Sequence, residues 1–80
     1  IGYGAGYNSL GTNSIAIGAN ASYNNVPNAN TIVLNATGAA LDAASTSSFY
    51  AKPVRRITTT TGFYPAYYNP TTGEIAYYQP

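Results

Sequence analysis

The sequence contains no cysteine and no histidine among its 80 residues. The absence of cysteine excludes disulfides, and the absence of both residue types excludes the common zinc sites and the Ser-His-Asp and Cys-His catalytic arrangements. Asp42 and Glu74 are the only carboxylate side chains, and the alanine-rich stretch and the turn that hold them indicate no shared cleft. We therefore predict a protein that is not an enzyme and that uses no metal or cofactor.

Charged side chains are also scarce, since three basic and two acidic residues leave a net charge of +1. So small a charge predicts no nucleic-acid partner. No apolar run is long enough to cross a bilayer, so we expect no membrane insertion. Methionine is absent as well, and we expect the chain to be a segment or a processed product of a longer protein.

The residues that are present favour assembly. Nine tyrosines and regularly placed isoleucine, valine and leucine argue against a disordered chain. A chain of this length buries only a modest fraction of its surface when it folds alone. Because disulfides and metals are excluded, oligomerisation is the reinforcement that remains, and we expect the partners to be copies of the same chain.

A short strand is predicted within residues 13–21, where Ile15 and Ile17 alternate with small side chains and Gly18 ends the pattern. A similar strand recurs at residues 30–34. Asparagine-rich clusters with turn-forming character separate the repeats, at residues 7–13 and 22–28. A strand and a turn at a fixed period are typical of a β-solenoid, so we predict β-roll repeats over residues 1–38, completed by neighbouring chains.

These repeats resemble the head repeat of trimeric autotransporter adhesins and the related repeats in tail-fibre proteins of phages and large viruses. The resemblance implies a left-handed parallel β-roll in which three chains pack around a common axis. It implies that Ile15 and Ile17 point to the coil interior and the trimer axis. It also implies that Gly18 forms a tight corner. We predict an assembly core that comprises Ile15, Ile17, Gly18, Ile32 and Leu34.

Residues 39–48 are rich in alanine and serine, and they form either one or two helical turns or, as we favour, an irregular connector. Residues 49–57 read as an extended strand that Pro53 confines to an edge or a bulge. The basic residues gather here, and a solvated or inter-chain polar face is favoured over an anion or glycan contact. These basic residues are Lys52, Arg55 and Arg56.

A tyrosine-rich β-hairpin is predicted at the end of the chain, with strands at 66–68 and 75–78 and a loop at 69–74. Together with the strand at 49–57 it is expected to form the module 49–80. Residues 49–55 and 67–75 resemble the segment just upstream of the endosialidase-type intramolecular chaperone of viral tail fibres. The chaperone itself is not in this sequence, so its protease activity does not carry over.

Two sequons and four tyrosines are candidate contact sites. Asn20 and Asn35 are candidate N-glycosylation sites after the two clearest strands, although chance is a fair alternative in so polar a chain. The hairpin tyrosines are candidates for glycan or inter-chain contact, and packing between chains is favoured because each doublet puts one ring on each face. They are Tyr67, Tyr68, Tyr77 and Tyr78.

We expect an all-β, elongated chain that serves as a structural, non-enzymatic subunit of an extracellular or virion fibre, such as a tail-fibre or adhesin stalk, assembled as a homotrimer. One alternative is a subunit of an open-ended helical extracellular filament, in which a strand of one copy completes the sheet of the next and which carries glycans. A second alternative is an adhesin tip that binds cell-surface glycans through the hairpin tyrosines.

Overall fold

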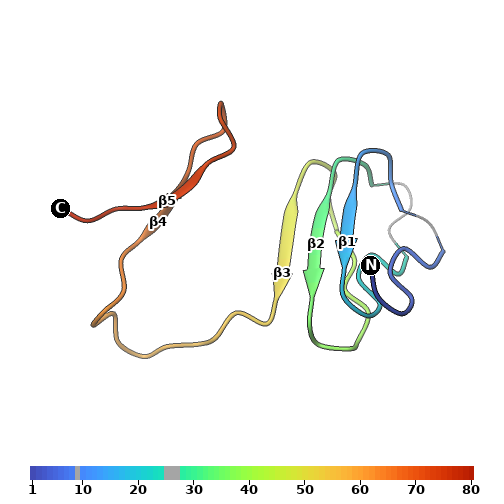
Figure 1. Cartoon of the computed structure of the whole chain (residues 1–80), viewed down its shortest axis with the longest axis horizontal. Helices are drawn as coiled ribbons and strands as arrows, with labels where there is room; N and C mark the ends of the chain where they lie inside the picture. Colours follow the sequence, from blue (N-terminus) through green and yellow to red (C-terminus); the bar gives the residue numbers. More distant parts are fainter. Residues whose placement is uncertain (9, 25–27) are drawn as a thin grey trace.

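The chain is all-β in a computed structural model, which confirms the predicted class at this level. The structure describes residues 1–8, 10–24 and 28–80, and no helix occurs within them. Three parallel strands form one sheet and an antiparallel pair forms the other (Figure 1). The parallel strands are β1 (Ile15–Ile17), β2 (Ile32–Asn35) and β3 (Phe49–Lys52), and the pair is β4 (Ala66–Tyr68) and β5 (Ile75–Tyr77).

Paired residues on neighbouring strands of the parallel sheet are always the same number of positions apart in the sequence. Ile15 pairs with Ile32, and Ile32 pairs with Phe49, so each strand lies 17 residues after its neighbour (32 − 15 and 49 − 32). Backbone bonds continue the ladder before each strand, because the Ile15 N–H donates to the carbonyl of Thr31 at 2.9 Å. The predicted correspondence between the strands at 13–17 and 30–34 is therefore confirmed.

The third strand extends the repeat beyond the predicted boundary. The sequence places residues 49–57 in one module with the hairpin, whereas the structure pairs β3 with β2. The preceding stretch also packs back, since Leu41 forms a bridge with Ala21 and Ala43 is only 3% exposed. Residues 39–48 are thus irregular, as favoured, but they belong to the same packed unit. We call residues 1–52 the coil segment.

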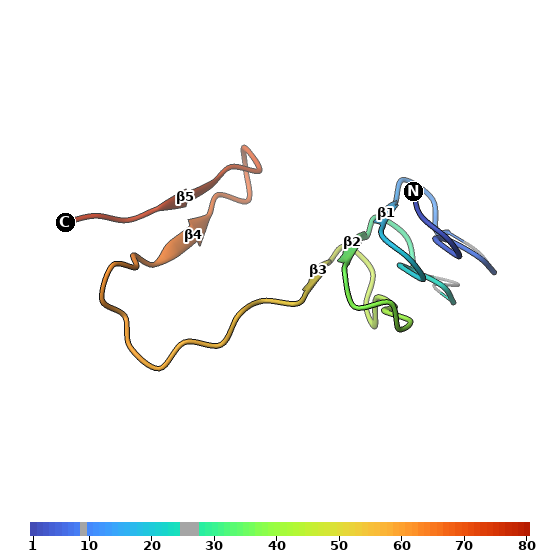
Figure 2. The same cartoon turned by 60° about the horizontal axis from the view of Figure 1, so that its bottom comes forward.

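Residues at the start of the chain form a further layer on the opposite side of β1. The Gly18 N–H donates to the carbonyl of Ile1 at 2.7 Å, and the Asn20 N–H donates to the carbonyl of Tyr3 at 2.8 Å. The sequence has an Ile-Gly pair at residues 1–2 and again at 17–18, and these two pairs form stacked corners. The cartoon shows these layers side by side with the three parallel strands (Figure 2).

A left-handed residue stands two positions before each parallel strand. Asn13, Asn30 and Ser47 have φ angles of 56°, 58° and 53°, and they follow the same spacing as the strands. Asparagine tolerates this conformation better than other residues with a Cβ, which otherwise pay about 1–2 kcal/mol. The asparagines at the first two positions are thus explained by backbone geometry, and serine is the less suited residue at the third.

Replacing Ser47 with asparagine should stabilise the chain. We expect Ser47→Asn to raise the free energy of unfolding by about 0.5–1 kcal/mol, because asparagine adopts positive φ at lower cost. Urea denaturation followed by circular dichroism measures this. The converse change, Asn30→Ser, is the matched control and should lower stability by a similar amount; a Ser47→Asn variant that is less stable would contradict the explanation.

The interior of the coil segment is narrow and filled by small side chains. Ala16 is 7% exposed and Val33 is fully buried, with Ala21 and Ala43 around them. The alternation of each strand therefore points alanine and valine inward and the larger apolar residues outward. The expectation that Ile15 and Ile17 point to the coil interior is wrong for this reason.

Candidate functional site

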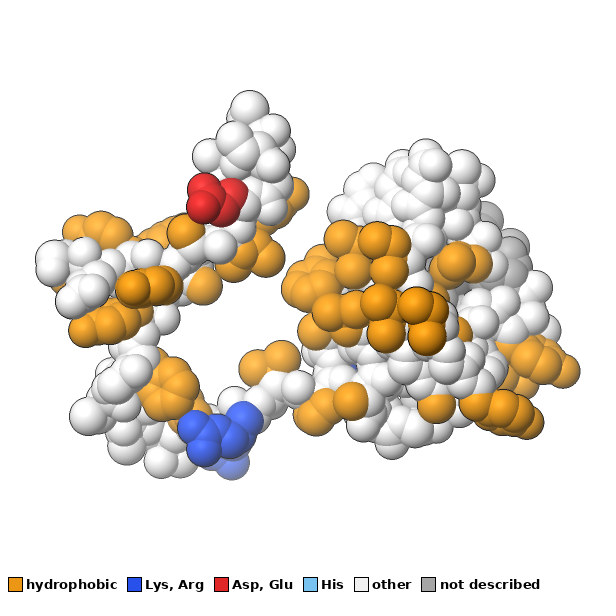
Figure 3. All heavy atoms as spheres, viewed as in Figure 1, with side chains coloured by type: hydrophobic (Ala, Val, Ile, Leu, Met, Phe, Trp, Pro, Cys, Tyr) orange, Lys and Arg blue, Asp and Glu red, His pale blue; other side chains and the backbone are white. Residues whose placement is uncertain are grey.

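The outer face of the parallel sheet carries large apolar side chains in two aligned rows. Within the single chain these side chains are between 38% and 53% exposed. Because the strands are parallel and in register, equivalent positions stack across the sheet. Apolar atoms gather over β1, β2 and β3 in the space-filling view (Figure 3). We call this surface the outer face, and it comprises Ile15, Ile17, Ile32, Leu34 and Phe49.

Four of the five residues expected to form an assembly core lie on the outer face, and the fifth, Gly18, follows β1. The position and composition of this face fit a surface that another molecule covers, because a monomeric protein seldom leaves so contiguous an apolar group in water. Phe49 is the member that sequence reasoning missed. The available signal was its spacing of 17 residues from Ile32, preceded by a serine pair that resembles the polar pair before Ile32.

Gly18 occupies the corner that the sequence predicts. Its φ is 110°, and a Cβ built there would overlap the backbone carbonyl oxygen of Asn35. The corner of one layer therefore touches the end of β2 in the next, and only a residue without a side chain allows that approach. This close contact fixes the distance between layers and so keeps the two rows of the outer face aligned.

Asn35 joins layers through its side chain. Its Nδ2 donates to the carbonyls of Ala19 at 2.9 Å and Ala39 at 2.7 Å, and its Oδ1 accepts from the Thr37 N–H at 3.1 Å. The residue is 5% exposed. The amide nitrogen that a glycan would occupy is thus buried and uses both of its protons in the fold.

Asn20, the other candidate glycosylation site, is more accessible. Its Nδ2 donates to the carbonyl of Gly38 at 2.8 Å, and its φ of 61° again marks a turn that suits asparagine. The residue is half-buried. Glycosylation of Asn20 would cost less free energy than glycosylation of Asn35, because a single hydrogen bond ties the Asn20 amide nitrogen to the fold.

Replacing Asn35 with aspartate should destabilise the coil segment strongly. The carboxylate keeps the acceptor but removes both donors, and it places a buried negative charge beside the carbonyls of Ala19 and Ala39. We expect a loss of about 3 kcal/mol or more in the free energy of unfolding, measured by urea denaturation. Asn20→Asp loses one exposed bond and should cost about 1 kcal/mol or less; equal losses at both sites would contradict the role given to Asn35.

Tyr50 lies on the inner side of β3, in register with Val33. Its hydroxyl accepts a hydrogen bond from the Ala44 N–H at 3.2 Å. A side-chain hydrogen bond with Ser48 is the main cause that lowers the pKa of the Tyr50 phenol, and Ser45 and the Ala44 N–H lower it further. The tyrosine therefore ties the irregular stretch before β3 to the sheet.

The hairpin tyrosines divide between two faces. Tyr68 pairs with Ile75, whereas Tyr67 pairs with Ala76, so the two members of this doublet point to opposite sides. Tyr67 packs edge-on against Tyr78, with ring centroids 6.3 Å apart. The predicted loop is confirmed, with the Gly73 N–H donating to the Asn69 carbonyl at 2.7 Å. The four tyrosines thus do not form one continuous platform.

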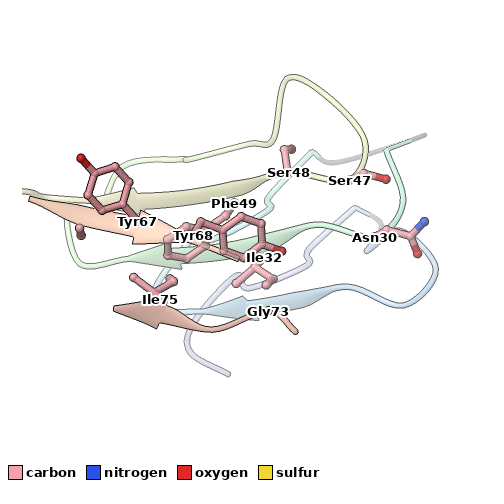
Figure 4. A pocket seen from close by; sticks show the side chains of 10 residues that line it. Asn30, Ile32, Ser47, Ser48, Phe49, Tyr67, Tyr68, Gly73 and Ile75 are labelled. Carbon is pink, nitrogen blue, oxygen red and sulfur yellow. The ribbon is translucent and has the colours of Figure 1, made fainter. Parts of the chain in front are cut away.

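An open hollow of about 760 Å³ lies between the outer face and the hairpin. Ile32 and Phe49 line one side, and Tyr68 and Ile75 line the other (Figure 4). Its lining contains no charged side chain. Because no strand of the hairpin packs directly against a strand of the parallel sheet, the outer face stays uncovered within one chain.

Polar residues that resemble catalytic or metal-binding groups have structural partners. The Asp42 carboxylate accepts from the Asn24 N–H at 2.7 Å, so it joins two stretches of the coil segment that lie 18 residues apart in the sequence, and not a local turn. Within the described residues, no group of histidine, cysteine, aspartate and glutamate has the composition of a metal site. Likewise, the part of the chain that the structure describes contains no helix able to span a membrane.

Comparison with models of known protein families, with curated proteins and with solved structures finds no match to this chain. The geometry of the outer face and of the layers beneath it is therefore the basis for assigning a function.

Proposed function

We propose that this chain is a structural segment of an extracellular or virion fibre, built from stacked β-coils and closed by copies of itself. The observation that carries the proposal is the outer face. Five large apolar side chains lie in register on one side of three parallel strands, over an interior of alanine and valine. Such a face is suited to packing against the same face of a neighbour around a common axis.

The narrow interior supports a need for neighbours. Among the described residues of the coil segment, the buried apolar side chains are three alanines and one valine. At roughly 25 cal/mol per Å² of apolar surface, so small a core contributes little against the entropy of ordering the chain. Covering the outer face would bury further apolar area, on side chains of isoleucine, leucine and phenylalanine.

Lateral packing fits the structure better than end-to-end addition of strands. The free edge of β3 ends at Lys52 and is followed by Pro53, and both residues protect a sheet edge against pairing with another strand. This favours a trimeric stalk of defined length over an open-ended filament. The division of the hairpin tyrosines between two faces likewise favours packing over a single glycan-binding platform.

Electron microscopy combined with sedimentation velocity tests the proposal. We expect short rods of uniform length whose mass corresponds to three copies of the chain. Filaments without a defined length would replace the trimeric stalk with the helical alternative. A compact monomer that unfolds cooperatively at micromolar concentration and below would rule out self-assembly as the function of the outer face.

A further inference from the structure

The segment between the two sheets, residues 53–65, differs from the rest of the chain in its exposure. Every residue of it is exposed, and it contains no strand. The cartoon shows it as an extended connection that leaves β3 and reaches the hairpin (Figure 2). Only its end contacts the hairpin, where Tyr64 stacks on Tyr77 with ring centroids 5.8 Å apart and the Pro65 carbonyl accepts from the Tyr78 N–H. We call residues 53–65 the linker.

The backbone of the linker is open to another molecule. The peptide groups from Val54 to Thr58 make no hydrogen bond with any other described residue. The first local bond within the linker joins the Thr61 N–H to the Thr59 Oγ1, and the next joins the Phe63 N–H to the Thr60 carbonyl. Endoproteases bind their substrates as extended chains that pair through exactly such free backbone groups. Residues 54–58 therefore offer free backbone groups that such an enzyme can pair with.

The basic residues of the whole chain lie at this one place. Lys52, Arg55 and Arg56 are the three cationic side chains of the sequence. Pro53 follows Lys52, and its ring and missing N–H disfavour cleavage of that bond. The Arg55 guanidinium lies 5.9 Å from the centre of the Phe63 ring, whereas the Arg56 side chain is exposed without such a partner. The Arg56–Ile57 bond is thus the best placed for an enzyme that selects arginine.

We propose that the linker is a processing site at which an arginine-specific endoprotease hydrolyses the Arg56–Ile57 peptide bond. Water adds across this bond, so that Arg56 gains a carboxylate and Ile57 gains an amino group. The products are residues 1–56, which contain the coil segment, and residues 57–80, which contain the hairpin. Cleavage would detach the hairpin from the stacked coils.

The fold allows this separation without loss of structure. The interlayer bonds of the coil segment join residues up to Lys52, whose carbonyl accepts from the Ala36 N–H at 2.8 Å. The hydrogen bonds of the hairpin all lie on the C-terminal side of the cleaved bond. The one nearest to the open end of the hairpin joins the Tyr78 N–H to the Pro65 carbonyl at 2.8 Å. No hydrogen bond of the described residues connects the two products, and besides the covalent link they share the contact between the Arg55 guanidinium and the Phe63 ring.

Limited proteolysis of the full chain with trypsin, followed by mass spectrometry, tests the proposal. We expect two fragments, 1–56 and 57–80, formed at a rate within about threefold of that for the same chain in denaturant-unfolded form, after correction for the effect of denaturant on the enzyme. We expect the circular dichroism spectrum of fragment 1–56 to show that the coil segment stays folded after cleavage. A native chain cut more than about 100-fold more slowly would mean that the site opens only by unfolding, and the proposal would fail.

Two sets of variants distinguish a cleavage site that needs the free backbone of the linker from simple exposure of an arginine side chain. Arg55→Gln should leave cleavage after Arg56 fast, whereas Arg56→Gln should move the residual cut to Arg55 and slow it at least tenfold. In Thr46→Arg, the new arginine is exposed but precedes Ser47, whose N–H donates to the Ala29 carbonyl. Cleavage after position 46 should be at least 100-fold slower than after Arg56, and comparable rates would overturn the proposal.

Discussion

The variant Gly18→Ala should fail to form the stacked coils. The added methyl group would overlap the Asn35 carbonyl oxygen, which belongs to the backbone of the next layer and has no rotamer to move away. The φ of 110° adds strain, because residues with a Cβ rarely adopt it. We expect a loss of at least about 3 kcal/mol in the free energy of unfolding, a large share of the stability of any small domain.

The matched control is Gly38→Ala, which separates backbone strain from overlap. Gly38 also has a positive φ, of 80°, but a Cβ built there meets no atom within 4 Å. Its replacement should cost about 1–2 kcal/mol, the strain alone. Urea denaturation followed by circular dichroism compares the two variants. Equal losses would mean that the contact between Gly18 and Asn35 does not hold the layers together.

The strands themselves were predictable from the sequence because their signals are local. The alternation around Ile15 and the turn residues around Gly73 each need only a few neighbouring residues, and the structure has β1 and the hairpin at these places. β3 was harder to place in the sheet. Its sequence shares the spacing of the first two strands but not their isoleucines, so its partner is defined only by the backbone ladder.

Which face of the strands is buried was not predictable from alternation alone. A period-two pattern separates Ile15 and Ile17 from Ala16, but it does not say on which side the chain returns. The space inside the coil decides this, because it accepts Ala16 and Val33 and leaves the larger side chains outside. Interior size is set by long-range stacking, as in the contact between Gly18 and Asn35, and no local pattern encodes it.

The role of Asn35 illustrates the same limit. In the sequence, Asn35 belongs to a sequon after a strand, and this motif predicts a glycosylation site on a surface turn. In the structure it is 5% exposed and bonds to two carbonyls. A short amide at the end of a strand can cap neighbouring layers or carry a glycan, and only the position of the adjacent layer distinguishes the two.

The second large effect is expected at the centre of the outer face, where Leu34→Glu should abolish self-assembly. Leu34 belongs to the middle strand and is 38% exposed, so a carboxylate there stays partly hydrated in the single chain. In the assembly the same carboxylate would lie against apolar side chains without a partner, which costs several kcal/mol. We expect the dissociation constant to rise by roughly 1,000-fold, since about 1.4 kcal/mol corresponds to each factor of ten.

Sedimentation velocity across a concentration series measures this change. Thr46→Glu adds the same charge at an exposed position outside the outer face and should leave assembly unchanged within about threefold, while Leu34→Met tests volume without charge and should also assemble. If Leu34→Glu assembled as tightly as Thr46→Glu, the outer face would not be the interface. Because the side chain points away from the coil interior, the variant should keep its fold, so that loss of assembly reports the interface rather than stability.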